Sequence, residues 1–139
     1  MAIKSEDIFI KTTGKTDVID ITSNVHKFVT GSGISSGIAT LFVPGSTAAL
    51  TTIEFESGAV NDLKRAIDRL APLDINYEHN ERWGDGNGYA HVRAALLGPS
   101  LHMPIIDGKL SLGTWQQIVL LDFDNRPRQR QVIIQIMGE

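Results

Sequence analysis

The stretch TWQQIVLLDFDNRPRQRQVIIQIM, residues 114–137, decides the fold of this chain. The segment 114–123 is long enough and apolar enough to form a central strand of a sheet. Residues 125–127, Asn-Arg-Pro, turn the chain, and residues 131–137 form a last strand. Two long strands this close in sequence place β-structure in the C-terminal part of the chain.

The segment that precedes this stretch continues the β-pattern. Leu101, Met103 and Ile105 alternate with their neighbours, as in a strand with one buried face. Asp107-Gly108 suits both left-handed positions of a type I′ turn. We therefore predict a tight turn there between two antiparallel strands.

The N-terminal two thirds of the chain mix strands with helices. The strongest helix is predicted near residues 58–70, where Val60, Leu63, Ile67 and Leu70 recur at helical spacing. A loop is predicted over residues 80–88, since three glycines in five positions oppose both helix and strand. The other expected elements are strands near residues 8–11, 18–21, 38–43 and 47–55 and helices near 25–29 and 89–97.

The order of these elements predicts the fold class. Hairpins at the C-terminal end favour a largely antiparallel sheet with helices packed on it, rather than a doubly wound parallel sheet. A length of 139 residues is typical of one domain. We expect residues 1–139 to form a single α+β domain of largely antiparallel β-structure with packed helices.

Bulk composition excludes several classes of protein. Without cysteine the chain can form neither a disulfide nor a zinc–thiolate site. A formal net charge of −3 argues against a general nucleic-acid binder, whose surface is basic. No apolar run approaches the roughly 18–20 residues that span a bilayer, and the first residues lack a signal-peptide pattern. We expect a cytoplasmic protein that binds neither nucleic acid nor a membrane.

Side chains that can carry chemistry gather in the middle third of the chain. His79, Glu81, Asp85, His91 and Arg93 lie around a glycine-rich loop that runs into a helix. Imidazole and carboxylate are the usual ligands of zinc and similar divalent ions, and a helix N-terminus after a loop favours an anion. The alternative interpretation is a set of solvated loop charges with one partly buried histidine.

Two hydroxyls and one carboxylate near residue 50 are further candidates for the functional site. Gly45-Ser46-Thr47 is either a turn that binds phosphate oxygens through its N–H groups and hydroxyls or an ordinary polar turn. Glu54 lies in an otherwise apolar strand. If it faces inward, it is an acid–base or metal-ligand candidate; if it faces water, it is the polar half of an alternation.

The stretch of residues 114–137 also contains an aromatic residue and three arginines that are candidates for a binding site. A ligand ring could stack on Trp115, although a tryptophan at the entry to a strand is more often part of a core or an interface. Arg126, Arg128 and Arg130 share one side of an extended segment, because alternate residues share a face. They either attract an anion or form a charged, solvated edge, and the solvated edge is the favoured interpretation.

Taken together and in order, these motifs resemble those of the YjbQ family. The resemblance covers nearly the whole chain, and the ordered string of motifs is more specific than any one of them. The matching segments are Phe42-Val43-Pro44-Gly45-Ser46-Thr47-Ala48-Ala49-Leu50-Thr51 with Glu54, Tyr77-Glu78-His79, Ala90-His91, Leu96-Leu97-Gly98-Pro99-Ser100-Leu101, Pro104, Gly108, Leu110, Gly113-Thr114-Trp115-Gln116 and Gly138-Glu139.

The resemblance implies an α+β fold, a homotrimer and a pocket near a subunit boundary. It also implies a thiamine-phosphate synthase activity, which joins a hydroxymethylpyrimidine diphosphate to a thiazole phosphate with release of diphosphate. Many family members have a histidine where this chain has Gly45. The pocket residues that the resemblance implies are Ser46, Thr47, Glu54, His79, His91, Ser100 and Trp115.

The first functional interpretation is a transferase that acts on small phosphorylated molecules such as thiamine precursors. Arg93, Ser46 and Thr47 would hold phosphate oxygens, and Ser100 and Trp115 would complete the substrate site. The catalytic candidates are Glu54 and His91, with His91 positioning or protonating the substrate. Either Glu54 or Asp85 could bind a magnesium ion that neutralises the departing diphosphate.

The second interpretation is a non-catalytic trimeric protein that binds a metal ion or a small anionic ligand. The expected metal ligands are His79, Asp85 and His91, which would hold a divalent ion such as magnesium or zinc. In both interpretations we expect His91 at the functional site with His79 beside it.

Overall fold

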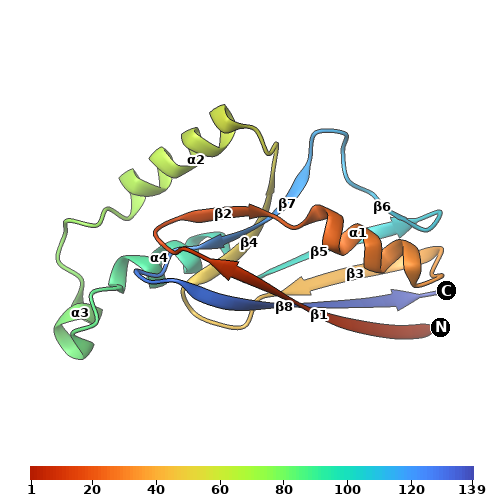
Figure 1. Cartoon of the computed structure of the whole chain (residues 1–139), viewed down its shortest axis with the longest axis horizontal. Helices are drawn as coiled ribbons and strands as arrows, with labels where there is room; N and C mark the ends of the chain where they lie inside the picture. The colour runs from red at the N-terminus through yellow and green to blue at the C-terminus, as the bar shows by residue number, and fades with distance from the viewer.

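The computed structural model describes all residues from 1 to 139, and Figure 1 shows how they are arranged. Its elements in chain order are β1 (Ala2–Thr12), β2 (Asp17–Asp20), α1 (Thr22–Gly31), β3 (Ser36–Phe42), β4 (Ala48–Ile53), α2 (Ser57–Leu70), α3 (Glu78–Trp83), α4 (Gly88–Leu97), β5 (Ser100–Ile106), β6 (Lys109–Leu110), β7 (Gln117–Asp122) and β8 (Arg128–Gly138).

The larger of two sheets has five strands in the order β1-β8-β3-β5-β6, and all neighbours are antiparallel. β1 pairs with β8 along its whole length, so the two ends of the chain lie side by side (Figure 1). The β3–β8 pair is so close that a Cβ on Gly37 or Gly138 would lie 2.1 Å from a carbonyl oxygen of the opposite strand. Only glycine fits at these two positions.

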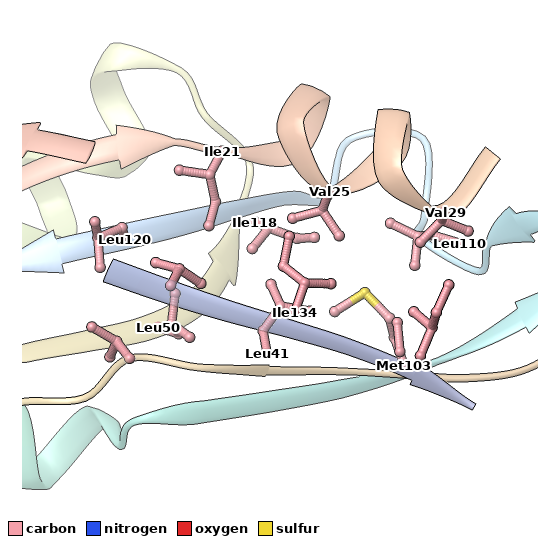
Figure 2. Close-up of a cluster of buried hydrophobic side chains, with 14 of the residues drawn as sticks. Ile21, Val25, Val29, Leu41, Leu50, Met103, Leu110, Ile118, Leu120 and Ile134 are labelled. Carbon is pink, nitrogen blue, oxygen red and sulfur yellow. The ribbon is translucent and has the colours of Figure 1, made fainter. Parts of the chain in front are cut away.

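The smaller sheet has three antiparallel strands in the order β2-β7-β4 and stacks, together with α1, on one face of the larger sheet. Figure 2 shows how the main core fills the space between them. Val25 and Val29 of α1 and Ile118 and Leu120 of β7 point into this core, which also contains Ile134 of β8, and all five are fully buried. Burial of this apolar surface is the dominant stabilising term of the fold.

Helices cover the other face of the smaller sheet. Val119 and Leu121 of β7 pack there against Ile67 of α2 and against Ala90 and Ala94 of α4. β7 is therefore buried on both faces, as predicted for a central strand. The result is a single α+β domain in three layers, with the larger sheet on one side, the smaller sheet and α1 in the middle, and α2 and α4 on the other side.

The structure confirms the predicted turn at Asp107-Gly108. These two residues join the antiparallel strands β5 and β6 with φ angles of 50° and 76°, both in the left-handed region. Asp-Gly is the pair that adopts this geometry with little strain.

Two predicted boundaries are wrong. The predicted loop over residues 80–88 is helical in its first half, because α3 continues to Trp83 and the glycines come only after it. Gly84, with a φ angle of 70°, ends that helix. The central strand begins at Gln117 rather than Thr114, because Gly113 and Gln116 bond to each other in a turn that precedes it.

One buried ion pair fastens the two sheets together at one end. Arg130 of β8 donates from Nε and Nη2 to the two carboxylate oxygens of Asp122, at the end of β7, both at 2.8 Å. The hydroxyl of Thr12 in β1 donates to the same carboxylate at 2.6 Å. Asp122 is fully buried and Arg130 is 9% exposed. These hydrogen bonds join β1 and β8 of the larger sheet to β7 of the smaller one.

Removal of the arginine from this pair should destabilise the protein strongly. Arg130→Met leaves the carboxylate of Asp122 buried without its counter-charge, which typically costs about 3–5 kcal/mol. We expect that loss in the free energy of unfolding measured by urea denaturation. Arg126→Met, at an exposed position four residues earlier, is the matched control and should change it by less than about 0.5 kcal/mol. Equal effects of both substitutions would contradict the assigned role of the pair.

The neighbouring Asp124 should make stability depend on acid pH. Burial raises its pKa, but hydrogen bonds from Asn125, Asn87, Arg128 and Thr47 outweigh burial and lower the pKa from 3.8 to about 2. Because the folded pKa lies below the unfolded one, this stabilisation is complete above pH 3.8 and is lost as the pH falls through 2.

We therefore expect the free energy of unfolding to drop between pH 4 and pH 2 by about 2 kcal/mol more in the wild type than in Asp124→Asn. Chemical denaturation at a series of pH values measures this difference. Asp74→Asn, at an exposed position, is the control and should keep the wild-type slope. A slope in Asp124→Asn as steep as in the wild type would contradict the prediction.

Candidate functional site

A polar pocket of about 440 Å³ opens where the β3–β4 connection, α3, α4 and the β7–β8 connection meet. We call it the histidine–arginine pocket. It lies at the end of the two sheets that the Asp122–Arg130 pair fastens. The residues that line it are Gly45, Ser46, Thr47, His79, Trp83, Asp85, Asn87, His91, Asp124, Arg128 and Arg130.

The turn between β3 and β4 forms one wall of the pocket. Gly45 has a φ angle of 126°, which side chains rarely adopt, and a Cβ there would lie 3.1 Å from Nη1 of Arg130. The buried hydroxyl of Thr47 accepts a hydrogen bond from Nη2 of Arg130 at 2.6 Å and donates to Asp124 at 3.1 Å. The absence of a side chain on Gly45 therefore leaves Nη1 of Arg130 uncovered at the pocket wall.

Two arginines at the start of β8 are held in place by two aspartates. Arg130 is fixed on Asp122, and Arg128 donates from Nε to Asp124 at 3.0 Å, with its Nη2 2.8 Å from the same oxygen. Neither arginine uses Nη1 in a hydrogen bond within the protein. Each guanidinium is thus oriented by its carboxylate and keeps donors for a ligand.

Both aspartates are ionised at neutral pH. Burial opposes the charge on Asp122, but hydrogen bonds from Arg130 and Thr12 outweigh it and lower the pKa. Hydrogen bonds also lower the pKa of Asp124, as described above. The two arginines therefore sit on permanently charged partners, which keeps the pocket wall rigid over the physiological pH range.

Two histidines face each other across α3 and α4. The ring centroids of His79 and His91 are 4.2 Å apart with an interplanar angle of 38°. Nδ1 of His79 is buried without a hydrogen bond and lies 3.4 Å from a carboxylate oxygen of Asp85. The pKa of His91 is lowered by burial and by His79, against the opposite effects of Asp85 and Asp124. His91 is therefore neutral at pH 7, where it can accept a proton or donate a hydrogen bond.

The glycine-rich loop is tied to the arginine side of the pocket. The side chain of Asn87 donates to Asp124 at 3.3 Å, and that of Asn125 donates to the carbonyl of Asp85 at 2.9 Å. Asn80 of α3 accepts from the N–H of Gly88, the first residue of α4, at 2.8 Å. These bonds bring α3 back against α4 and so place His79 beside His91.

A smaller, mostly apolar hollow of about 240 Å³ adjoins the pocket and shares Gly45, Ser46 and His91 with it. Its other lining residues are Ala48, Ala94, Ala95 and Pro99. A ligand could therefore place a charged group among the arginines and a small apolar or ring-shaped part in this hollow.

The structure brings together five of the predicted site residues: Ser46, Thr47, His79, Asp85 and His91. It does not bring the other four to this pocket. Glu54 is exposed just after β4, and Ser100 is exposed at the start of β5, opposite Phe42. Trp115 is 71% exposed in the turn before β7.

Arg93 is placed on the opposite side of α4 from His91. It is 3% exposed and donates to the carbonyl of Ala71 at 3.0 Å and to the hydroxyl of Thr16 at 2.8 Å. Residues two apart on a helix do not share a face, so the expected separation from His91 holds. The expectation that Arg93 holds phosphate together with Ser46 and Thr47 does not fit this position.

The acidic half of the pocket wall, Asp122 and Asp124, does not appear among the site residues predicted from the sequence. The solvated edge predicted for Arg126, Arg128 and Arg130 is wrong for Arg130, which is buried. The available signal was two acidic residues inside an otherwise apolar strand end, because buried carboxylates require a counter-charge.

The residues present do not form a ready-made metal site. Two imidazoles and one carboxylate are close, but no group of three or more acidic or histidine side chains is arranged to hold a metal ion. Nδ1 of His79 is buried and makes no hydrogen bond within the protein. Separately, none of the helices is both long and apolar enough to cross a membrane.

Comparison with known sequences and structures gives a consistent result. The UPF0047 protein YjbQ-like family model matches residues 6–139. A UPF0047 protein of Methanothermobacter thermautotrophicus is 35% identical over 139 residues, which is 100% of this chain and 95% of the relative. The UPF0047 protein YugU of Bacillus subtilis is 39% identical over 131 residues, 93% of this chain and 96% of the relative.

Solved structures agree. A YbjQ-like protein of unknown function from Sulfolobus solfataricus superimposes with a TM-score of 0.94 at 35% identity, covering 99% of each chain. A hypothetical protein from Aeropyrum pernix gives 0.90 at 31% identity, covering 98% of this chain and 99% of that one. The family match and the shared fold both extend over practically the whole chain, and the chain therefore belongs to the UPF0047 family of YjbQ-like proteins.

Proposed function

We propose that the histidine–arginine pocket binds a small phosphorylated molecule. The observation that carries this proposal is the pair of arginines, Arg128 and Arg130, whose Nη1 groups are free while their other nitrogens are fixed on aspartates. Donors oriented in advance bind an oxyanion without the cost of reorganisation. The N–H groups and the Ser46 hydroxyl of the β3–β4 turn supply further donors on the same wall.

The shape of the pocket supports a ligand larger than a free ion. A volume of about 440 Å³ lies within the ~300–1,000 Å³ range of small-molecule sites. The adjoining apolar hollow beside His91 and Ala94 suits a ring or a short apolar chain. A phosphorylated ring compound would match both parts.

The reaction that we propose is the thiamine-phosphate synthase type of transfer, in the cytoplasm. The ring nitrogen of a thiazole phosphate forms a bond to the methylene carbon of a pyrimidine diphosphate. The carbon–oxygen bond to the diphosphate breaks, and diphosphate leaves with the electron pair. Arg128 and Arg130 would stabilise the charge that develops on the departing diphosphate, and neutral His91 would donate a hydrogen bond to it.

The divalent ion expected from the sequence stays a prediction. His79, Asp85 and His91 are the candidate ligands for magnesium or zinc, but they are not arranged as a complete set, so the proposed transfer assigns no step to the ion. A non-catalytic protein that only binds the phosphorylated molecule or an ion is the alternative to the transferase. Substrate turnover separates these two functions.

Two substitutions test the proposed function. We expect the wild-type chain to form thiamine phosphate from the two precursors, measured by fluorescence after oxidation to thiochrome. His91→Ala should reduce the rate by about 10²-fold or more. Arg128→Gln should weaken diphosphate binding, measured by calorimetry, about tenfold or more, because a hydrogen bond to a charged group is worth about 1.5–3 kcal/mol. Because the pKa of His91 is lowered from 6.5, the ring gains a proton only below that pH, and since the protonated ring is the stronger hydrogen-bond donor to diphosphate, this contact should not be lost there.

Arg126→Gln is the matched control for Arg128→Gln. It removes the same charge two residues earlier, at an exposed position that does not line the pocket, and should leave binding and rate unchanged. Diphosphate binding without thiamine phosphate would reject the transfer and leave the non-catalytic function. If diphosphate does not bind at all, the proposal for the pocket is wrong.

We also propose that the protein is a homotrimer. The face of the larger sheet opposite the core carries a row of apolar side chains across neighbouring strands. In the register of the sheet, Ile3, Met137, Ile38 and Pro104 lie next to one another, and no element of the chain packs on them. The first three are 64%, 45% and 47% exposed. An exposed apolar row of this kind is typical of a subunit interface.

Light scattering at micromolar concentration should give a mass near three times 15.2 kDa. Ile38→Asp places a charge in the centre of the apolar row and should shift the mass toward that of one chain. Leu70→Asp, on a residue of α2 that is 71% exposed and does not belong to this row, should leave the trimer intact. A wild-type mass of one chain would reject the proposal.

A further inference from the structure

A second, smaller cavity lies behind α4, on the side opposite to His91. It has a volume of about 220 Å³ and is enclosed by the β1–β2 connection, α2 and α4. We call it the Arg93 cavity. Its polar lining consists of Lys15, Thr16, Lys64, Asp68, Tyr89 and Arg93. It shares no residue with the histidine–arginine pocket.

Arg93 is the central feature of this cavity. Its side chain is 3% exposed, and its guanidinium lies 5.1 Å from the centre of the Tyr89 ring. Nε and Nη1 are satisfied by Ala71 and Thr16. Nη2 is buried and has no hydrogen bond, although a carboxylate oxygen of Asp68 lies 3.1 Å away. That distance makes an ion pair, but the orientation does not make a hydrogen bond.

A purely structural role explains only part of this arrangement. It accounts for Nε and Nη1, which link α4 to the end of α2 and to the β1–β2 connection. It does not account for the unsatisfied Nη2 or for two lysines gathered at the same cavity. A buried donor without a partner is costly, and native proteins seldom leave one.

The charge of the cavity favours an anion. Lys15, Lys64 and Arg93 bring three positive charges, and Asp68 brings one negative charge, so the lining has a net charge of +2 (3 − 1) in a chain of net charge −3. Asp68 is also 63% exposed, so water screens its pairing with Arg93. An incoming anion would meet excess positive charge and an unused buried donor.

We propose that the Arg93 cavity binds a small tetrahedral oxyanion, either inorganic phosphate or the phosphoryl end of a phosphomonoester. Its cationic groups come from three different segments, Lys15 from the β1–β2 connection, Lys64 from α2 and Arg93 from α4, and such a spread suits a tetrahedral ion better than a planar carboxylate. The volume is below the usual range for whole small molecules, which fits a single phosphoryl group.

The new site has a physical connection to the histidine–arginine pocket. The backbone N–H of Lys15 donates to the carbonyl of Asp124 at 2.7 Å, and Asp124 lines that pocket. Lys15 and Thr16 both have left-handed backbone angles, with φ of 55° and 64°. An anion in the Arg93 cavity therefore contacts the segment that holds the backbone of Asp124, while its own binding does not depend on any ligand of the pocket.

Titration of the full-length chain with inorganic phosphate, followed by two-dimensional amide NMR at constant ionic strength, tests the site. We expect saturable shifts of the amides of Lys15, Thr16 and Tyr89. Lys64→Gln should weaken this binding about tenfold, because a charge-assisted contact is lost. Lys109→Gln, which removes the same charge from an exposed position on β6, should leave the affinity unchanged. Phenyl phosphate in place of phosphate shows whether an ester is accepted.

Several results would overturn the proposal. One is the absence of saturable shifts at Lys15, Thr16 and Tyr89 with either phosphate or phenyl phosphate. Another is an affinity that Lys64→Gln leaves unchanged. An equal response to acetate at the same ionic strength would show general charge screening rather than a phosphate site. Arg128→Gln must leave these shifts in place, since it changes only the other pocket, so the two proposals fail independently.

Discussion

The bidentate ion pair between Asp122 and Arg130 is the interaction on which the rest of this structure depends. It joins the end of the buried strand β7 to β8 of the other sheet, with Thr12 and Thr47 bonded to the same two side chains. Removing two charges from water is expensive, and only near-complete hydrogen bonding offsets that cost. The same atoms hold the sheets together and form the wall of the histidine–arginine pocket, so the stability of the domain and the rigidity of its site have one origin.

That shared origin also explains why the pocket presents arginines without being strongly positive. Arg128 and Arg130 each form an ion pair with an aspartate that neutralises their charge. Their free Nη1 groups therefore attract a ligand mainly as oriented hydrogen-bond donors, not through net positive charge. The neutral His91 faces them from α4. Gly45 completes the arrangement, because any side chain at that position would press against Nη1 of Arg130.

Much of the fold could be predicted from the sequence, because helices, strands and turns depend largely on residues that are close together in the chain. The apolar run that became β7, the spacing of Val60 to Leu70 in α2 and the Asp107-Gly108 turn all have local physical causes. The site could be predicted only in part. The glycine-rich loop indicated that His79 and His91 meet, and the spacing of His91 and Arg93 indicated different faces of a helix. No local pattern tells which face meets which cavity, and the acidic residues at the end of β7 indicate only that a buried counter-charge is needed, not that Arg130 supplies it.

The pairing of β1 with β8 sets the order in which this chain can fold. β1, the first strand of the domain in sequence, has only β8, the last strand, as its neighbour, so neither strand can join the larger sheet until β8 has been synthesised. Contacts between residues this far apart in sequence slow the search for the native state. Until then β1 is unpaired, and its charged side chains oppose aggregation, because charged strands add poorly to the sheets of other molecules. These side chains are Lys4, Glu6, Asp7 and Lys11. The charges on this edge strand thus protect β1 from pairing with other molecules during the interval before β8 is made.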